Sequence, residues 1–210
     1  MTLVLYDFPQ SGNARKVRLL LAELGLEPEH RYVPFTRPRP DWYVALNPFA
    51  GVPALQDGDV FLAESHAILR YLALREGRDD LYPAEPARRA RVEWALDAFA
   101  THTQARIGPL NRMLVAETRD ETGASHPERA DPERVAAALP DAREGLAAFE
   151  AFCADDGTVC GGGFTIADCA ASPVLLRTRI FPLDLDAEFP KLARVRDAVA
   201  ARPTAAVLGP

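Results

Sequence analysis

The chain has 210 residues and a net charge of −6, with 48% hydrophobic and 26% charged residues. An acidic protein has no overall field that attracts nucleic acid or anionic lipid, and no apolar run reaches the roughly 20 residues of a membrane helix. The three cysteines form no CxxC pair and the four histidines are scattered, so a disulfide framework or a zinc site is not expected. The N-terminus lacks the basic segment of a signal peptide. We therefore expect a cytoplasmic globular protein that binds no nucleic acid, membrane or metal.

The first 75 residues switch repeatedly between strand and helix patterns. Residues 3–8 alternate as a strand, and the apolar residues of 17–24 follow helical spacing up to the helix stop Gly25. A second strand is expected at 30–35, followed by a long loop and a hairpin over 54–63, with a short helix after it. Strands joined by a helix are parallel, with a right-handed crossover, and a hairpin is antiparallel. The pattern predicts a small α/β domain.

The pattern after Arg75 is helical. Residues 76–86 are rich in charge, Gly and Pro, as in a linker, and 87–116 read as a long amphipathic helix with a kink at Gly108-Pro109. A polar loop follows, then a helix that starts at Asp131 and bends or breaks at Pro140. We expect an α/β domain at 1–76, a linker at 77–86 and an all-helical domain at 87–210.

A second kind of helix is predicted near Thr165. Residues 166–176 leave almost no polar face, which indicates a buried helix. The first amides of such a helix need partners other than water, and Thr165-x-x-Asp168 forms a capping box with Asp in place of the usual Glu. Loss of Asp168 is expected to cost ~1 kcal/mol or more.

Four motifs stand in a fixed order along the chain. They are Ser11-Gly12-Asn13 leading into residues 16–21, the segment 47–55, the segment 64–72, and the Thr165–Asp168 box. Together they resemble the cytosolic glutathione transferases over essentially the whole chain, and within them the bacterial, theta- or nu-like groups with a hydroxyl residue at the active site. The resemblance implies a thioredoxin-like N-terminal domain plus an all-helical C-terminal domain, glutathione as co-substrate and a homodimer.

Ser11 is the candidate catalytic residue. A thiol with a pKa near 8.5 is a poor nucleophile until it is ionised. Ser11 falls between a strand and a helix, where free amides and the positive end of the helix dipole meet, and its hydroxyl can donate to a sulfur anion. Asn13 can also donate or orient the loop. The resemblance implies that Ser11 carries the activating group; the alternative is that either residue simply caps the helix.

Other glutathione contacts follow from the resemblance. It implies a cis bond between Val52 and Pro53, with the main chain of Val52 pairing with the tripeptide in the manner of an added strand. Ser65 and the first amides of its helix form a carboxylate site for the γ-glutamyl end, and Glu64 accepts from the ammonium. A serine cap preceded by a solvated acid remains the alternative.

Two positions differ from the family pattern or are not fixed by it. The family often has Gln or Lys where this chain has Gly51, which implies weaker glutathione binding. The contact to the glycyl carboxylate is assigned to Arg37 or Arg39. His66, which follows Ser65, is expected to point outward.

The predicted reaction is transfer of the glutathione thiolate to small, largely apolar electrophiles, as in detoxification. The residues expected near the acceptor are Phe8, His102, Arg106 and Met113. A glutathione-dependent peroxidase or disulfide reductase is an alternative, although no cysteine precedes residue 153 to carry a mixed disulfide. A zeta-type isomerase normally has a Ser-Ser-Cys-like loop, which is absent, and a non-catalytic interaction module is a third class. The homodimer contact is expected around Trp94, Ala98 and Thr101.

Overall fold

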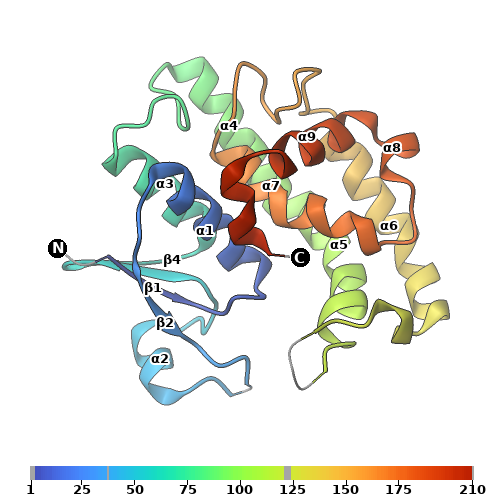
Figure 1. The fold of residues 1–210 in the computed structure, drawn as a ribbon, viewed down its shortest axis with the longest axis horizontal. Helices are drawn as coiled ribbons and strands as arrows, with labels where there is room; N and C mark the ends of the chain where they lie inside the picture. The colour runs from blue at the N-terminus through green and yellow to red at the C-terminus, as the bar shows by residue number, and fades with distance from the viewer. Residues whose placement is uncertain (1–2, 37, 121–123, 210) are drawn as a thin grey trace. The chain divides into compact units, whose positions relative to one another are not determined.

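The computed structural model describes residues 3–36, 38–120 and 124–209. These residues form two compact units, one made of residues up to Pro83 together with those from Arg202 onward, and the other of Ala84–Ala201 (Figure 1). The segment from Arg202 onward is predicted to belong to the helical domain, whereas its contacts assign it to the first unit.

The first unit is built on a four-stranded mixed sheet with the order β2-β1-β3-β4. The strands are β1 (Leu3–Asp7), β2 (Glu29–Tyr32), β3 (Ala54–Asp57) and β4 (Val60–Ala63). β1 is parallel to β2 and antiparallel to β3, and β3 is antiparallel to β4. The helices of this unit are α1 (Gly12–Leu24), α2 (Asp41–Leu46), α3 (Ser65–Arg75) and the 3-10 helix η5 (Pro203–Leu208). The predicted thioredoxin-like fold class is confirmed.

Two elements of this unit differ from the sequence prediction. β2 covers Glu29–Tyr32 instead of 30–35, and every residue in it is exposed, so hydrophobic alternation does not mark its ends. Val33 then turns into the core, and its N–H donates to the carbonyl of Asp7 at 2.8 Å. α2 lies within the predicted long loop. Six residues are too few to show helical periodicity, and only Tyr43 among them is buried.

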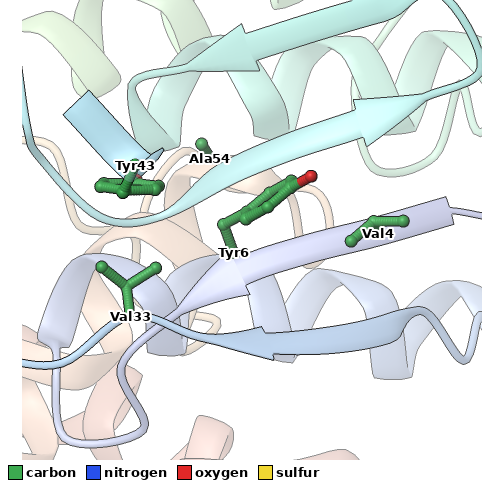
Figure 2. Close-up of a cluster of buried hydrophobic side chains, with 5 residues drawn as sticks. All are labelled: Val4, Tyr6, Val33, Tyr43 and Ala54. Atoms are coloured by element: carbon green, nitrogen blue, oxygen red, sulfur yellow. The ribbon is translucent and has the colours of Figure 1, made fainter. Parts of the chain in front are cut away.

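A small hydrophobic cluster joins α2 to the sheet. Val4, Tyr6, Val33, Tyr43 and Ala54 are all buried in it, and Figure 2 shows their side chains together. The rings of Tyr6 and Tyr43 have centroids 6.2 Å apart, a spacing typical of packed aromatic pairs. This cluster fixes α2 and therefore the start of the loop that leads into β3.

The second unit is helical, as predicted. Its first part is α4 (Pro86–Ala98), the π-helical turn η1 (Phe99–Thr103), α5 (Gln104–Asn111) and the π-helical turn η2 (Arg112–Ala116). After these come η3 (Pro127–Arg129), α6 (Pro132–Glu150), α7 (Ile166–Arg177), η4 (Thr178–Ile180), α8 (Leu185–Glu188) and α9 (Pro190–Ala200). No helix in the ranges that the structure covers is long and apolar enough to cross a membrane.

The helix predicted to bend or break at Pro140 does not break there. α6 runs from Pro132 to Glu150 through that proline, with Asp131 as its N-cap, accepting from the N–H of Glu133 at 2.9 Å. Pro140 is exposed, and so is Ala136, whose carbonyl loses its helical hydrogen bond to the proline. That carbonyl can bond to water instead, so the helix continues.

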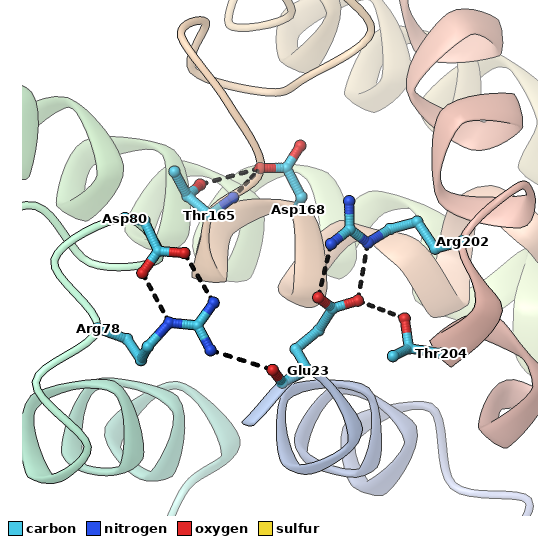
Figure 3. Close-up of polar contacts among 7 residues, drawn as sticks. All are labelled: Glu23, Arg78, Asp80, Thr165, Asp168, Arg202 and Thr204. Atoms are coloured by element: carbon cyan, nitrogen blue, oxygen red, sulfur yellow. Dashed lines mark hydrogen bonds and ion pairs between the residues drawn. The ribbon is translucent and has the colours of Figure 1, made fainter. Parts of the chain in front are cut away.

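α7 is the buried helix of the second unit, and Ile166 through Leu175 all lie in the core. A capping box closes its start, where the N–H of Ala167 donates to Thr165 Oγ1 at 3.3 Å. The N–H of Thr165 donates to Asp168 Oδ2 at 2.8 Å (Figure 3). Asp168 Oδ1 also accepts from the N–H of Val159 at 2.7 Å. The same carboxylate therefore joins the helix to the loop before it.

Candidate functional site

The register of the sheet gathers three loops at one end. Tyr6 on β1 is opposite Ala54 on β3, and Ala54 is opposite Ala63 on β4, with antiparallel pairing in both cases. The C-terminal ends of β1 and β4 therefore lie beside the start of β3. The segments at this end are 8–13, 47–53 and 64–66. They contain the predicted glutathione contacts Ser11, Val52, Pro53, Glu64 and Ser65.

Ser11 is the N-cap of α1. Its backbone is extended (φ −68°, ψ 123°), and its Oγ accepts from the N–H of Ala14 at a long 3.4 Å. The hydroxyl proton has no acceptor in the described part of the chain. A hydroxyl can accept and donate at once, so capping and donation to a ligand are compatible. Asn13 lies in the first turn of α1 and is half-buried.

Val52 presents a main-chain donor and acceptor just before β3. The bond between Val52 and Pro53 is cis, as the resemblance implied. Within the residues that the structure covers, neither the N–H nor the C=O of Val52 forms a hydrogen bond. An extended peptide can therefore pair with both groups.

Side chains on either side hold this loop in place. The carbonyl of Gly51 accepts from the hydroxyl of Tyr43 and from Asn47 Nδ2, the latter at 2.9 Å. Tyr43 and Asn47 are both buried. The residue next to Val52 is thus fixed by two donors, and its lack of a side chain leaves the space beside it open.

Arg39 is 4% exposed and joins two loops. Its Nε donates to the carbonyl of Ala50 at 3.3 Å, its Nη1 donates to the carbonyl of Pro34, and its guanidinium lies over the ring of Phe35 at 5.1 Å. The assignment of Arg39 to the glycyl carboxylate stays a prediction. The other candidate, Arg37, lies outside the described residues.

Glu64 and Ser65 form a strained corner at the start of α3. Glu64 has φ +69° and ψ 115°, which a non-glycine residue rarely adopts. Its side chain is exposed and makes no cap hydrogen bond. The hydroxyl of Ser65, a mostly buried residue, has no partner among the residues described. The corner therefore offers a carboxylate, a hydroxyl and the open first-turn amides of a helix.

His66 does not point outward, so that prediction is wrong. Its Nε2 lies 3.3 Å from Nζ of Lys16, a residue of α1 that is 2% exposed. Burial lowers the pKa of Lys16 to about 7, against an opposing effect of Glu64. Burial also lowers the pKa of His66 to about 3, and the charges of Lys16 and Arg70 add to this.

The burial of Lys16 has a local signal in the sequence. Lys16 stands three and four residues before Leu19 and Leu20, both fully buried, and so shares a helix face with them. The partner at position 66 is 50 residues away, and no local spacing indicates it.

The residues predicted near the acceptor have varied surroundings. Phe8 is buried in the first unit and stacks on Phe35, with ring centroids 5.0 Å apart. The other three belong to the second unit. There His102 is exposed on η1, Arg106 forms an ion pair with Glu144 at 2.7 Å, and Met113 is half-buried on η2. Their role stays a prediction.

No group of three His, Cys, Asp or Glu residues in the described ranges is arranged to hold a metal ion.

Comparisons with known proteins agree with this architecture. The family model for the glutathione S-transferase N-terminal domain matches residues 5–79, and the one for the C-terminal domain matches residues 119–203. Glutathione S-transferase 3 of Zea mays is 36% identical over 208 residues, covering 96% of this chain and 90% of that protein. Maleylacetoacetate isomerase of Pseudomonas aeruginosa is 33% identical over 205 residues, covering 95% and 92%.

A solved structure extends the agreement to three dimensions. The theta class glutathione S-transferase of Xanthomonas axonopodis pv. citri, crystallised with glutathione bound, superimposes with a TM-score of 0.82 at 29% identity, covering 97% of this chain and 95% of that one. With both family models and relatives that match nearly its whole length, the chain belongs to the glutathione S-transferase family.

Proposed function

We propose that this protein is a glutathione transferase that joins the glutathione thiolate to small, largely apolar electrophiles. The supporting observation is a set of unused hydrogen-bonding groups at one end of the sheet. Within the described residues, the Ser11 hydroxyl proton has no acceptor, and the Val52 main-chain N–H and C=O and the Ser65 hydroxyl have no hydrogen-bond partner. A thiol, a peptide group and a carboxylate are what these groups complement, and glutathione carries all three.

In this proposal Ser11 activates the sulfur. Its hydroxyl donates to the thiolate while its Oγ still caps α1, and the open amides at the helix start add positive potential. Both effects lower the thiol pKa, and the thiol proton passes to water. The sulfur then forms a bond to the electrophilic carbon, and the leaving group departs with its bonding electrons. Asn13, in the first turn, orients this loop.

The rest of the tripeptide has matching groups. Val52, held by the cis bond to Pro53, pairs with the cysteinyl peptide group, Ser65 and the first amides of α3 bind the γ-glutamyl carboxylate, and Glu64 accepts from the ammonium. Arg39 is the candidate for the glycyl carboxylate. Because Gly51 adds no side-chain contact, we expect modest affinity.

The residues proposed to contact the electrophile are Phe8, His102, Arg106 and Met113. The similarity to a theta class transferase and the serine at position 11 support a serine-type, theta-like enzyme of bacterial type. We also propose that it acts as a cytoplasmic homodimer, as the resemblance to the family implies.

Isomerisation is the second candidate, because a relative matched along nearly its full length is a maleylacetoacetate isomerase. The loop Ser11-Gly12-Asn13 has no cysteine, which favours transfer. Peroxide reduction, disulfide reduction and a purely non-catalytic role are the remaining candidate functions. Glutathione titration by calorimetry, followed by parallel assays of all four activities, separates them; binding with no turnover would favour the non-catalytic role.

Ser11→Ala tests the mechanism. We expect glutathione binding to be retained and kcat for chloro-dinitrobenzene to fall about a hundredfold, as when one donor to a developing anion is removed. Ser11→Thr, which keeps a hydroxyl, is the control and should keep most of the activity. Turnover at the wild-type level in Ser11→Ala would remove Ser11 from the reaction and make Asn13 the next candidate.

A further inference from the structure

The chain contains 24 basic residues, but only two of them, Lys16 and Lys191, are lysines. Lys16 is 2% exposed, while the Lys191 side chain is 39% exposed. Arginine stays protonated in proteins, whereas a buried lysine can lose its proton. The chain thus has a titratable cation at this fully buried position, although arginine serves nearly everywhere else.

Lys16 connects the two helices whose N-terminal ends carry Ser11 and Ser65. It lies on α1, and its Nζ is 3.3 Å from Nε2 of His66, the residue that follows Ser65 on α3. The charge of Glu64, the residue just before α3, acts on Lys16, and Arg70 acts on His66 from the next turn of α3. With its pKa far below neutral pH, His66 is a neutral imidazole and can accept a hydrogen bond from the ammonium.

We propose that Lys16 is a positioning residue for the γ-glutamyl end of glutathione: it holds the Glu64–Ser65 corner through His66, and its buried charge attracts the carboxylate bound there. This inference rests on the proposed glutathione site. The attraction is effective because a charge surrounded by protein is screened far less than one in water.

Stability alone does not explain the lysine. Burial lowers its pKa from 10.5 to about 7, so the folded state binds fewer protons than the unfolded state between these values. The free energy of unfolding therefore rises as the pH increases from about 7 towards 10.5, and the buried charge is most costly below pH 7. An apolar replacement is expected to leave the fold at least as stable.

Linkage gives the proposal a measurable consequence. A carboxylate bound near Lys16 favours its charged form, so ligand binding raises the pKa of Lys16 and takes up protons above pH 7. S-methylglutathione isolates this effect, because it has no thiol to ionise. Calorimetry at pH 8 in phosphate and in Tris gives the number of protons taken up.

We expect the wild type to take up roughly 0.3–0.5 proton more than Lys16→Met, and Lys191→Met to match the wild type.

In turnover, Lys16→Met should raise KM for glutathione about tenfold with kcat within about twofold, since only binding is affected. His66→Gln keeps an acceptor and should resemble the wild type, whereas His66→Leu should raise KM. Equal proton uptake and equal KM in wild type and Lys16→Met would overturn the inference.

A measurement on the wild type alone guards against a variant that fails to fold. Protein labelled with [15N]lysine gives two Nζ signals, so Lys16 can be titrated with and without S-methylglutathione. We expect its pKa to rise by about one unit on binding. An unchanged pKa with bound ligand overturns the inference and leaves the proposed function intact. Absence of any binding by the wild type overturns both.

Discussion

Asp168 holds a carboxylate at a position from which water is excluded. It is 0% exposed, and it accepts from Thr165 Oγ1 at 2.9 Å in addition to the main-chain N–H groups of Thr165 and Val159. Burial still outweighs these bonds and raises its pKa to about 6. Because Asp168 binds more protons in the folded state than in the unfolded state between pH 3.8 and about 6, its contribution to stability falls as the pH rises through that range and is level above it.

Asp168→Ala is expected to lower the free energy of unfolding by about 3 kcal/mol, because it leaves buried donors unsatisfied at roughly 1–3 kcal/mol each. This exceeds the cost expected of a cap alone, since the carboxylate also binds Val159. Urea denaturation at pH 7 measures it. Asp168→Asn, which keeps one acceptor, should lose less and should lose the pH dependence between 4 and 6. Folded Asp168→Ala keeps its specific activity, and an unchanged melting temperature would contradict the assignment.

At the scale of elements, helix α1 is held at its far end by the last segment of the chain. Glu23, whose side chain is 7% exposed, accepts from Arg202 Nε at 2.7 Å and Nη2 at 2.6 Å, and also from Thr204 (Figure 3). Arg78 Nη1 donates to the Glu23 carbonyl at 3.1 Å. Burial raises the pKa of Glu23, whereas the hydrogen bonds from Arg202 and Thr204 lower it. Together with the nearby positive charges, these bonds outweigh the effect of burial, so the net shift of the pKa is downward. Leu208 in η5 is buried in the same unit.

Glu23→Gln is expected to destabilise the protein by about 2 kcal/mol, the contribution of a charge-assisted hydrogen bond. The folded pKa of Glu23 lies below its unfolded value, so its contribution is present above pH 4.5 and is lost as the pH falls through the folded pKa. Urea titrations at pH 7 and pH 4 should therefore show a larger difference between Glu23→Gln and wild type at pH 7. Glu27→Gln, at an exposed residue in the loop after α1, is the matched control and should change nothing. Equal losses in the two variants would argue against a specific clamp.

The elements that the sequence predicts are those whose signal is local. Gly25 ends α1 with φ +67°, as its position after an apolar helix predicts, and β4 covers 60–63 after the Asp-Gly turn. The clamp on Glu23 joins residues 179 and 181 positions apart, which no periodicity reports. α2 is missed because it is short and mostly exposed.

The candidate site also has features that the sequence predicts and features that it does not. Ser11, Val52 and Ser65 stand next to strand ends, so the order of strands and the hairpin are enough to bring them to one end of the sheet. The strain at Glu64 has no sequence signal, because the residue is not glycine. The Lys16–His66 pair depends on how two helices pack, and the helical spacing gives only the burial of Lys16.

At the scale of the whole molecule, association depends on the exposed surface. Trp94 on α4 is 63% exposed, and its ring meets the ring of Phe152 edge-on, with centroids 4.7 Å apart. Ala98, the last residue of α4, is half-buried, and Thr101 in the adjoining turn η1 is exposed. Tryptophan is enriched where proteins associate, and its large apolar surface is usually covered. This supports the proposed homodimer contact.

We expect light scattering after size exclusion to give about twice the chain mass of 22.9 kDa, and Trp94→Glu to weaken the dimer at least tenfold, since it places a charge at the contact. Leu74→Glu, at another exposed apolar residue, is the control and should stay dimeric. A dimer of unchanged affinity in Trp94→Glu would exclude this face.

Ser11, Val52 and Ser65 all come from the first unit of one chain, so the dissociated variant should still bind S-methylglutathione. If binding is lost together with the dimer, a partner chain must contribute to the site.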